Sequence, residues 1–171
     1  MANAKGRDIS LWNVIQNWDL FAAANDFVLI RTGQNNYEDR LFRSHYQEAK
    51  KRRMRIGLWH FVQPNLVNAH EQAMTFVKIY KSLPEQERII ALDCEDISFK
   101  TELGYSITTP LTKSQYTWLV STMLNDIMRE IPGVRIGIYT RKSFWNQWVH
   151  TPGTPYSFNG VPYVTPDWSK F

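Results

Sequence analysis

Three acidic residues close the segment 88–96, Arg-Ile-Ile-Ala-Leu-Asp-Cys-Glu-Asp, whose first part has the apolar composition of a buried strand. Side chains alternate along a strand, so Asp93 and Glu95 are expected on one face, and Leu92 and Cys94 on the other. Two residues of rise separate the α-carbons of Asp93 and Glu95 by roughly 6.6 Å. Carboxylates this close shift each other's pKa, and glycoside hydrolysis uses such a pair. The same residues also fit carboxylates that cap the following loop or are simply solvated.

A further carboxylate, Asp8, stands near the end of the first apolar stretch of the chain, residues 6–11. Asp8 and Ser10 share a face of the strand expected there. If the strands form a β/α barrel, Asp8 is expected to face the mouth of the barrel, as Asp93 and Glu95 do. A turn or helix-capping role for Asp8 is an equally good interpretation of its position.

The rest of the chain alternates between two hydrophobic patterns. Short apolar runs rich in β-branched and aromatic residues predict strands, and stretches with apolar residues at i, i+3 and i+4 predict helices. The predicted strands cover residues 6–11, 27–31, 55–62, 89–93 and 134–139. The predicted helices cover residues 17–24, 39–54, 67–83 and 113–131. This alternation predicts a single α/β domain, 1–171, built on a parallel sheet that is either open or closed into a barrel.

The composition excludes several other classes of protein. The chain has 171 residues, of which 43% are hydrophobic and 21% charged, as is typical of a globular protein. No apolar run is long enough to span a bilayer, and residues 1–10 lack the apolar core of a secretory signal, so neither membrane insertion nor a signal peptide is expected. One cysteine precludes an internal disulfide, and no Cys/His spacing suits zinc, so no metal and no cofactor are expected.

Nucleic acids and nucleotides are also disfavoured as ligands. The Gly-x-Gly-x-x-Gly and phosphate-loop motifs are both missing from the sequence. The formal net charge of +4 does not by itself indicate a nucleic-acid partner. The basic run 50–55 fits the solvated C-terminal end of a helix, with attraction to anionic wall polymers as the functional alternative.

Five motifs, in order along the chain, resemble those of one enzyme family. They are Gly-Arg-Asp-Ile-Ser-Leu-Trp at 6–12, Phe-Val-Leu-Ile-Arg-Thr-Gly at 27–33, Ile-Gly-Leu-Trp-His-Phe at 56–61, Ile-Ala-Leu-Asp-Cys-Glu at 90–95 and Gly-Ile-Tyr-Thr at 137–140. Their order and spacing, from about Lys5 to Trp148, resemble glycoside hydrolase family 25, the bacterial and phage muramidases. Trp59 stands where that family's Gly-x-Tyr-His-Phe strand has Tyr.

This resemblance implies a fold, an activity and a set of roles. The fold would be a flattened TIM-like (β/α) barrel. The activity would be hydrolysis of the β-1,4 bond after N-acetylmuramic acid in peptidoglycan. Glu95 would be the general acid, with a pKa raised by its neighbours, and Asp93 and Asp8 would be supporting carboxylates. Asp93 is expected to stay ionised.

Four further residues are expected to bind substrate at the barrel mouth: Tyr139, Trp59, Arg31 and His60. For Tyr139 and Trp59 the alternative is a place in the core, and for His60 a core position with satisfied ring nitrogens. For Arg31 the alternative is an ion pair with a carboxylate.

The chain departs from the family pattern after Trp148. The segment 161–168 is interpreted as a degenerate version of the family's next strand, although its prolines suit a central strand poorly. The later strands and the last active-site Asp are missing, so the barrel is expected to be incomplete at its C-terminal end. We expect the segment 151–171 to cover the open side, or else a second copy or a partner chain to do so.

Two alternatives to a muramidase follow. The first is a catalytically weak or silent domain of a phage particle that binds cell-wall glycans or has a structural role. The second is a β/α-barrel glycosidase acting on chitin-like chains. The expected partners are peptidoglycan glycan strands. The expected place of action is the bacterial cell wall, reached by a phage-encoded protein through a separately made pore.

Overall fold

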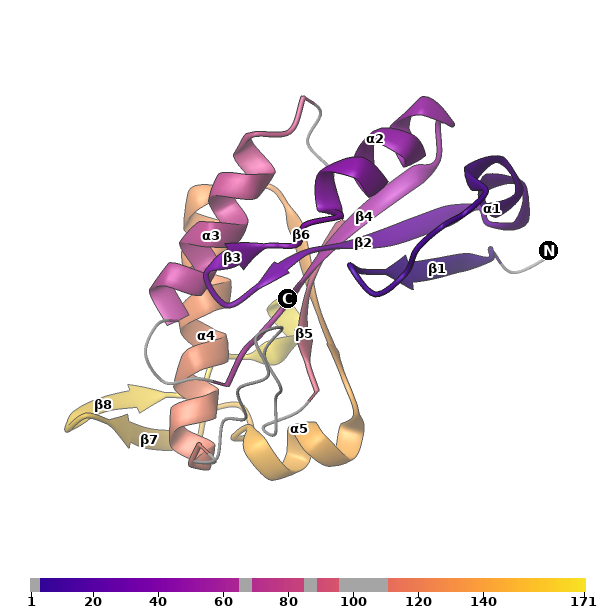
Figure 1. The fold of residues 1–171 in the computed structure, drawn as a ribbon. Coiled ribbons are helices and arrows are strands. Elements are labelled where there is room, and N and C mark those ends of the chain that lie inside the picture. Colours follow the sequence, from indigo (N-terminus) through magenta and orange to yellow (C-terminus); the bar gives the residue numbers. More distant parts are fainter. Residues whose placement is uncertain (1–3, 65–68, 85–88, 96–110) are drawn as a thin grey trace.

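A central sheet covered by helices dominates the computed structural model, which describes residues 4–64, 69–84, 89–95 and 111–171 (Figure 1). The strands are β1 (Gly6–Ile9), β2 (Phe27–Gln34), β3 (Tyr37–Glu38), β4 (Arg55–Phe61), β5 (Ile89–Cys94), β6 (Arg135–Thr140), β7 (Pro155–Phe158) and β8 (Val161–Val164). The helices are α1 (Trp18–Ala24), α2 (Phe42–Lys51), α3 (Ala69–Lys81), α4 (Lys113–Glu130), α5 (Lys142–Trp148) and a 3₁₀ turn at Trp168–Lys170.

Five strands of the main sheet are parallel and lie in the order β1-β2-β4-β5-β6, while β3 pairs antiparallel with β2. Neighbours in the sheet are therefore successive parallel strands of the chain, which is the winding of a β/α barrel. Among the described residues, β1 and β6 do not pair with each other, so the sheet stays open. The predicted α/β fold with a barrel-like, incomplete sheet is confirmed.

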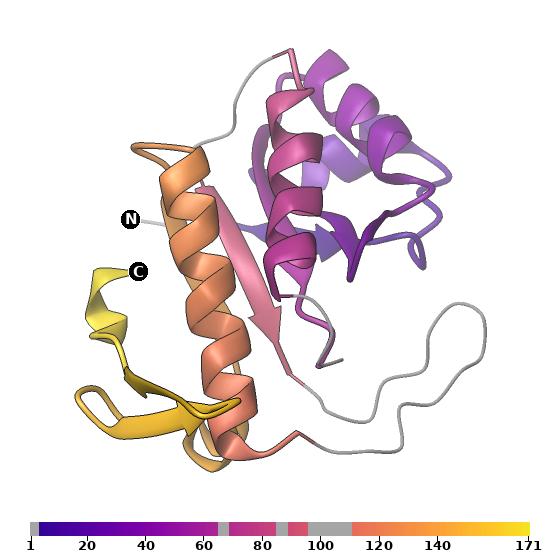
Figure 2. The same ribbon diagram turned by 90° about the vertical axis from the view of Figure 1, so that its left-hand side faces the viewer.

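The core lies between one face of this sheet and the helices α2, α3 and α4, which stand side by side in Figure 2. Alternate residues of the strands point to this layer, and they meet the apolar stripes of the helices. The buried strand residues include Val28, Ile30, Leu58, Ile90 and Leu92, and the helix residues include Phe42, Phe76, Tyr116, Leu119 and Met123. Cys94 is buried in the same layer, as predicted.

The beginnings of the helices follow from local side-chain chemistry. Asn17 accepts a hydrogen bond from the backbone of Leu20 and caps α1. Thr112 and Gln115 form a reciprocal capping box at the start of α4. At the other end of α2, Arg53 takes a left-handed backbone conformation, so the basic run ends this helix as predicted.

The segment after Trp148 differs from its prediction. Strand β8 pairs only with β7, in an antiparallel hairpin outside the main sheet, so the interpretation of 161–168 as the next barrel strand is wrong. Asn159 and Gly160, both with positive φ, form the turn between the two strands. Asn-Gly is the strongest short signal for a two-residue hairpin, and its geometry returns the chain on itself instead of adding it to the sheet.

The hairpin packs on α4, and the last turn lies beside α5 and the edge strand β6 (Figure 2). Phe158 stacks on Trp118 of α4 with ring centroids 4.2 Å apart, and Trp168 meets Trp145 of α5 edge-on at 5.2 Å. Of the residues after 150, those that reach the open face of the sheet are Lys170 and Phe171. Trp168 and Phe171 also lie beside Ile138 and Thr140 of the edge strand β6. The segment 151–171 thus packs on the molecule as expected, but it reaches the open side with its last residues alone, because its other aromatic side chains find partners on α4 and α5.

Candidate active site on the open face of the sheet

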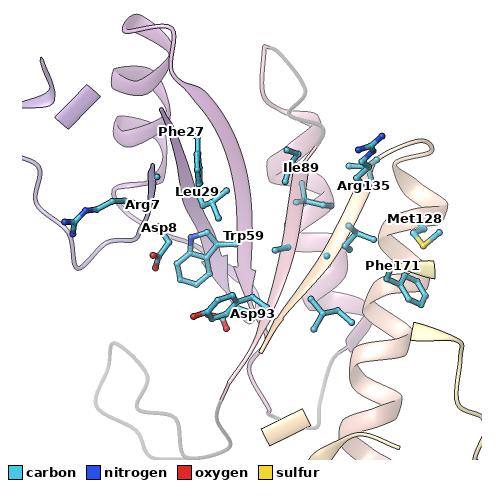
Figure 3. A pocket seen from close by; sticks show the side chains of 18 of the residues that line it. Arg7, Asp8, Phe27, Leu29, Trp59, Ile89, Asp93, Met128, Arg135 and Phe171 are labelled. Carbon is cyan, nitrogen blue, oxygen red and sulfur yellow. The ribbon is translucent and has the colours of Figure 1, made fainter. Parts of the chain in front are cut away.

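A cavity of about 880 Å³ lies on the face of the sheet opposite the core helices (Figure 3). Its floor is apolar and includes Phe27 and Leu29 of β2, Ile89 and Ala91 of β5, and Gly137 of β6. Small residues on the middle strands leave space for the cavity above the sheet. Gly57 of β4 is one of them, since a Cβ there would come within 2.5 Å of the Leu29 side chain.

Polar and aromatic side chains gather where the strands end. Figure 3 shows Asp8, Trp59 and Asp93 close together at one end of the cavity, away from Ile89 and Arg135. These three residues come from β1, β4 and β5, whose carboxyl ends meet at the same edge of the sheet. Ligands of β/α folds bind at this edge.

Register brings Tyr139 to the same end of the cavity. On β6 it lies directly opposite Asp93 of β5, and it lines the cavity with 62% of its surface exposed. Tyr139 and Trp59 therefore flank Asp93 from the two neighbouring strands, as expected of side chains that contact a sugar. An exposed aromatic ring beside carboxylates offers a sugar both a stacking face and hydrogen-bond acceptors.

Asp93 is buried, with 6% of its surface exposed, and its Oδ1 makes no hydrogen bond to any described residue. Burial, helped by the charges of Glu95 and Asp8 and opposed by that of Arg31, raises the pKa of Asp93 to about 7. The raised pKa favours the protonated form of Asp93 up to near-neutral pH. The expectation that Asp93 stays ionised is wrong, because spacing along a strand does not show how deeply a carboxylate is buried.

Glu95 follows directly after β5 and is half buried. The end of β6 holds its backbone in place: Arg141 Nη2 donates to the Glu95 carbonyl at 3.2 Å, and Thr140 Oγ1 donates to the Cys94 carbonyl at 2.6 Å. Asp8, Asp93 and Glu95, the acidic cluster, are near enough for the charges of the other two to act on Asp93. Asp96 lies outside the described residues.

His60 does not contribute to the cavity. It is fully buried on the helix side, with its Nδ1 3.0 Å from Thr32 Oγ1, its Nε2 3.2 Å from the Asn35 carbonyl oxygen, and its ring edge-on to Phe76. Burial lowers its pKa to about 4, so the ring is neutral at pH 7. The expectation that His60 binds substrate is wrong, because it follows Trp59 on the same strand and adjacent side chains point to opposite faces.

Arg31 is also withdrawn from the cavity. Its Nε donates to Asp39 Oδ2 at 2.7 Å, and both side chains are buried. The alternative that Arg31 pairs with a carboxylate is confirmed, and the expectation that it binds substrate is not met. Sequence reasoning missed Asp39. A signal for it exists, since an arginine on a mostly apolar strand needs a buried carboxylate partner.

The family model for glycosyl hydrolases family 25 matches residues 7–157, which is most of the chain. The chain belongs to this family. Its acidic cluster comes from two of the motifs that carried the sequence resemblance, Gly-Arg-Asp-Ile-Ser and Leu-Asp-Cys-Glu. No curated protein sequence matches the chain.

Solved structures agree with the family-25 fold. A family 25 glycosyl hydrolase from Bacillus anthracis is 20% identical with a TM-score of 0.68, and the match covers 85% of this chain and 64% of that one. A family 25 lysozyme from Aspergillus fumigatus is 22% identical with a TM-score of 0.68, covering 96% and 83%. A bacterial lysozyme from Streptomyces coelicolor is 25% identical with a TM-score of 0.62, covering 85% and 66%. This family-25 chain thus spans less than two thirds of the length of the Bacillus structure.

Within residues 4–64, 69–84, 89–95 and 111–171, no group of three or more His, Cys, Asp or Glu side chains is arranged to hold a metal ion. In the same residues, no helix has the length and apolar character needed to cross a membrane.

Proposed function

We propose that this chain is a muramidase, with residues 1–171 forming one catalytic domain. It hydrolyses the β-1,4 bond between N-acetylmuramic acid and N-acetylglucosamine in peptidoglycan. The observation that carries the proposal is the acidic cluster at the carboxyl ends of β1 and β5, with Asp8 and Asp93 lining a cavity wide enough for sugar rings. Similar solved structures described as muramidases, from Acremonium alcalophilum and Trichobolus zukalii, and one autolysin solved with a synthetic peptidoglycan ligand support this substrate class.

The chemistry follows from the positions of the three carboxyl groups. Glu95 gives its proton to the glycosidic oxygen, and the bond from that oxygen to the anomeric carbon breaks. Asp8, together with Asp93 when it is ionised, stabilises the positive charge that develops there. Water then adds at the anomeric carbon and returns a proton to the site. Because Asp93 can hold a proton near pH 7, it can either orient the 2-acetamido group of the sugar or hold the water.

The stereochemistry of the product separates these two roles of Asp93. Participation of the acetamido group retains the configuration at the anomeric carbon, whereas direct attack by water inverts it. Nuclear magnetic resonance of the first product anomer decides between them, and an inverted product excludes acetamido participation.

The proposal is tested by clearing of a Gram-positive cell-wall suspension. Glu95→Gln should lower the rate at least about 100-fold, because a general acid contributes that much or more. Glu130→Gln is the matched control, since Glu130 lies on α4 and pairs with Lys81 at the surface. A Glu95→Gln variant within a few-fold of the parent would remove Glu95 from this role.

The open sheet favours a second function, in which the chain binds wall glycans with little or no cleavage. In the described part of the chain the cavity has walls from β1 to β6 and a free edge beside β6. Binding to walls without release of reducing ends would support this function over the muramidase. Release of reducing ends from chitin oligomers, rather than from walls, would favour the chitin-directed glycosidase.

We place the action of the protein at the bacterial cell wall. A phage source is supported by the likeness to the endolysin domain of a Listeria phage, which is 20% identical with a TM-score of 0.67 and covers 94% of this chain and 81% of that one. A second copy or a partner chain over the free edge of β6 is part of the proposal, and light scattering at the concentration of the lysis assay tests it.

A further inference from the structure

A buried ion pair lies beside the acidic cluster but does not line the cavity. Arg31 of β2 and Asp39, between β3 and α2, are joined by a 2.7 Å hydrogen bond, and their side chains are 5% and 1% exposed. Arg31 Nη1 also reaches Gln34 Oε1 at 3.4 Å. A pair buried this deeply loses much of its electrostatic gain to desolvation, so it is weak evidence for a purely stabilising role.

The pair connects three strand ends that build the site. Asp39 Oδ2 accepts a second hydrogen bond, at 3.2 Å, from the backbone N–H of Leu11, in the turn that follows β1 and Asp8. The guanidinium of Arg31 lies over the indole of Trp59 on β4, with its Cζ 5.6 Å from the ring centroid. One ion pair therefore ties the end of β1 to β2 and to the aromatic wall of the cavity.

The pair also bears on Asp93. Within the described part of the chain, the groups whose charge acts on this carboxyl are Asp8 from β1, Arg31 from β2 and Glu95 at the end of β5, and Arg31 is the one cation among them. On the helix side of β5, burial raises the pKa of Cys94 and of Tyr116, so both are neutral at pH 7. The positive charge of Arg31 thus lowers the pKa of Asp93, whereas burial and the two acidic neighbours raise it.

We propose that Arg31 and Asp39 are positioning residues of this site. Their ion pair fixes the Trp59 indole and the turn after Asp8. It also keeps near Asp93 a positive charge that Asp39 partly neutralises. The catalytic role of the pair rests on the proposed function, whereas its contacts and its charge are properties of the protein without substrate. Asp39 matters because it anchors the guanidinium and partly neutralises it. The two residues should therefore act on Asp93 in opposite directions.

The test is the titration of the Asp93 carboxyl, followed by carbon NMR in the protein without substrate. Arg31→Met removes the cation and should raise the pKa of Asp93 by about one unit. Asp39→Asn leaves the cation uncompensated and should lower it. Arg31→Lys keeps the charge, so it should restore the parent titration but not the parent indole N–H signal of Trp59, because a lysine lacks the planar fork.

Arg43→Met is the matched control. Arg43 pairs with Glu38 at 2.7 Å in the same region, but both side chains are partly exposed, so the titration of Asp93 should not move. The inference is overturned if Arg31→Met and Asp39→Asn shift Asp93 in the same direction, or if neither shifts it. Should Arg31→Met fail to fold, Arg31→Lys and Asp39→Asn carry the test. Absence of wall lysis by the parent would contradict the proposed function and leave these titrations as valid as before.

Discussion

Two neighbouring isoleucines of β5 lie on opposite faces of the sheet. Ile90 points to the helices and is 2% exposed, whereas Ile89 faces the cavity and is 61% exposed. At the end of the same strand, Leu92 and Cys94 continue the packed face while Asp93 stands on the other. The same alternation thus builds a filled core on one side and leaves room for chemistry on the other.

This difference explains why a buried carboxyl group lies on the open face of the sheet and not on the helix face. On the helix face of β5, Ile90, Leu92 and Cys94 are packed into the apolar core, so a charge there would have no space. On the open face the floor is apolar but unfilled, and Asp93 is buried by the strand ends around it instead of by a partner. Its raised pKa is the consequence of that setting.

The sharpest test of the packed face is Ile90→Ala. It deletes buried methyl and methylene groups and leaves a cavity against the helices, so the free energy of unfolding should fall by about 2–5 kcal/mol. Denaturant unfolding followed by circular dichroism measures it. A loss below about 1 kcal/mol would mean that the helix layer can collapse onto the gap.

The acidic end of the open face is tested by Asp93→Asn. In the folded protein Asp93 binds its proton more tightly than in the unfolded chain, so stability should decline as pH rises from about 4 to about 7 and stay level above that. Removing the ionisable group should abolish this decline and add on the order of 3 kcal/mol at pH 8. Unfolding curves at pH 4, 6 and 8 measure both effects, and a variant that keeps the parent's pH dependence would show that another group causes it.

The smallest effect is expected for Ile89→Ala, the counterpart of Ile90→Ala on the open face. The side chain is already largely in solvent, so the loss should stay below about 1 kcal/mol. The same unfolding assay applies. A loss equal to that of Ile90→Ala would show that a second copy or a partner chain covers this face in solution.

Most of the fold could be predicted because its main elements each bury one periodic face. The strands 27–31, 55–62 and 89–93 and the long helix 113–131 were all predicted from apolar spacing and are present as β2, β4, β5 and α4. Helix α5 was missed because it has seven residues and buries only Phe144, which leaves no stripe to detect. The β7-β8 hairpin was missed because its prolines counted against strands, although Asn159-Gly160 signalled the turn.

Part of the candidate site could also be predicted from the sequence, and part could not. Alternation along one strand predicted that Asp93 lies on the face opposite Leu92 and Cys94, and it should have excluded His60 once Trp59 faced the cavity. That Arg31 needs a carboxylate partner could be predicted, but not which one, because a bulge in β2 between Arg31 and Gly33 and the turn into β3 bring Asp39 back beside it. Gly33 permits that return, since a Cβ there would lie 2.1 Å from the Tyr37 carbonyl oxygen.

The sequential strand order also sets when the site can exist during folding. Each parallel strand pairs with the one made just before it, so the sheet can grow strand by strand from its N-terminal end as the chain is made. An intermediate that holds β1, β2 and β4 already contains the Arg31–Asp39 pair and Trp59, but only one of the three carboxylates. Asp93 and Glu95 join the site only when β5 pairs with β4. A newly made chain therefore forms the frame of its site before the reactive groups join it.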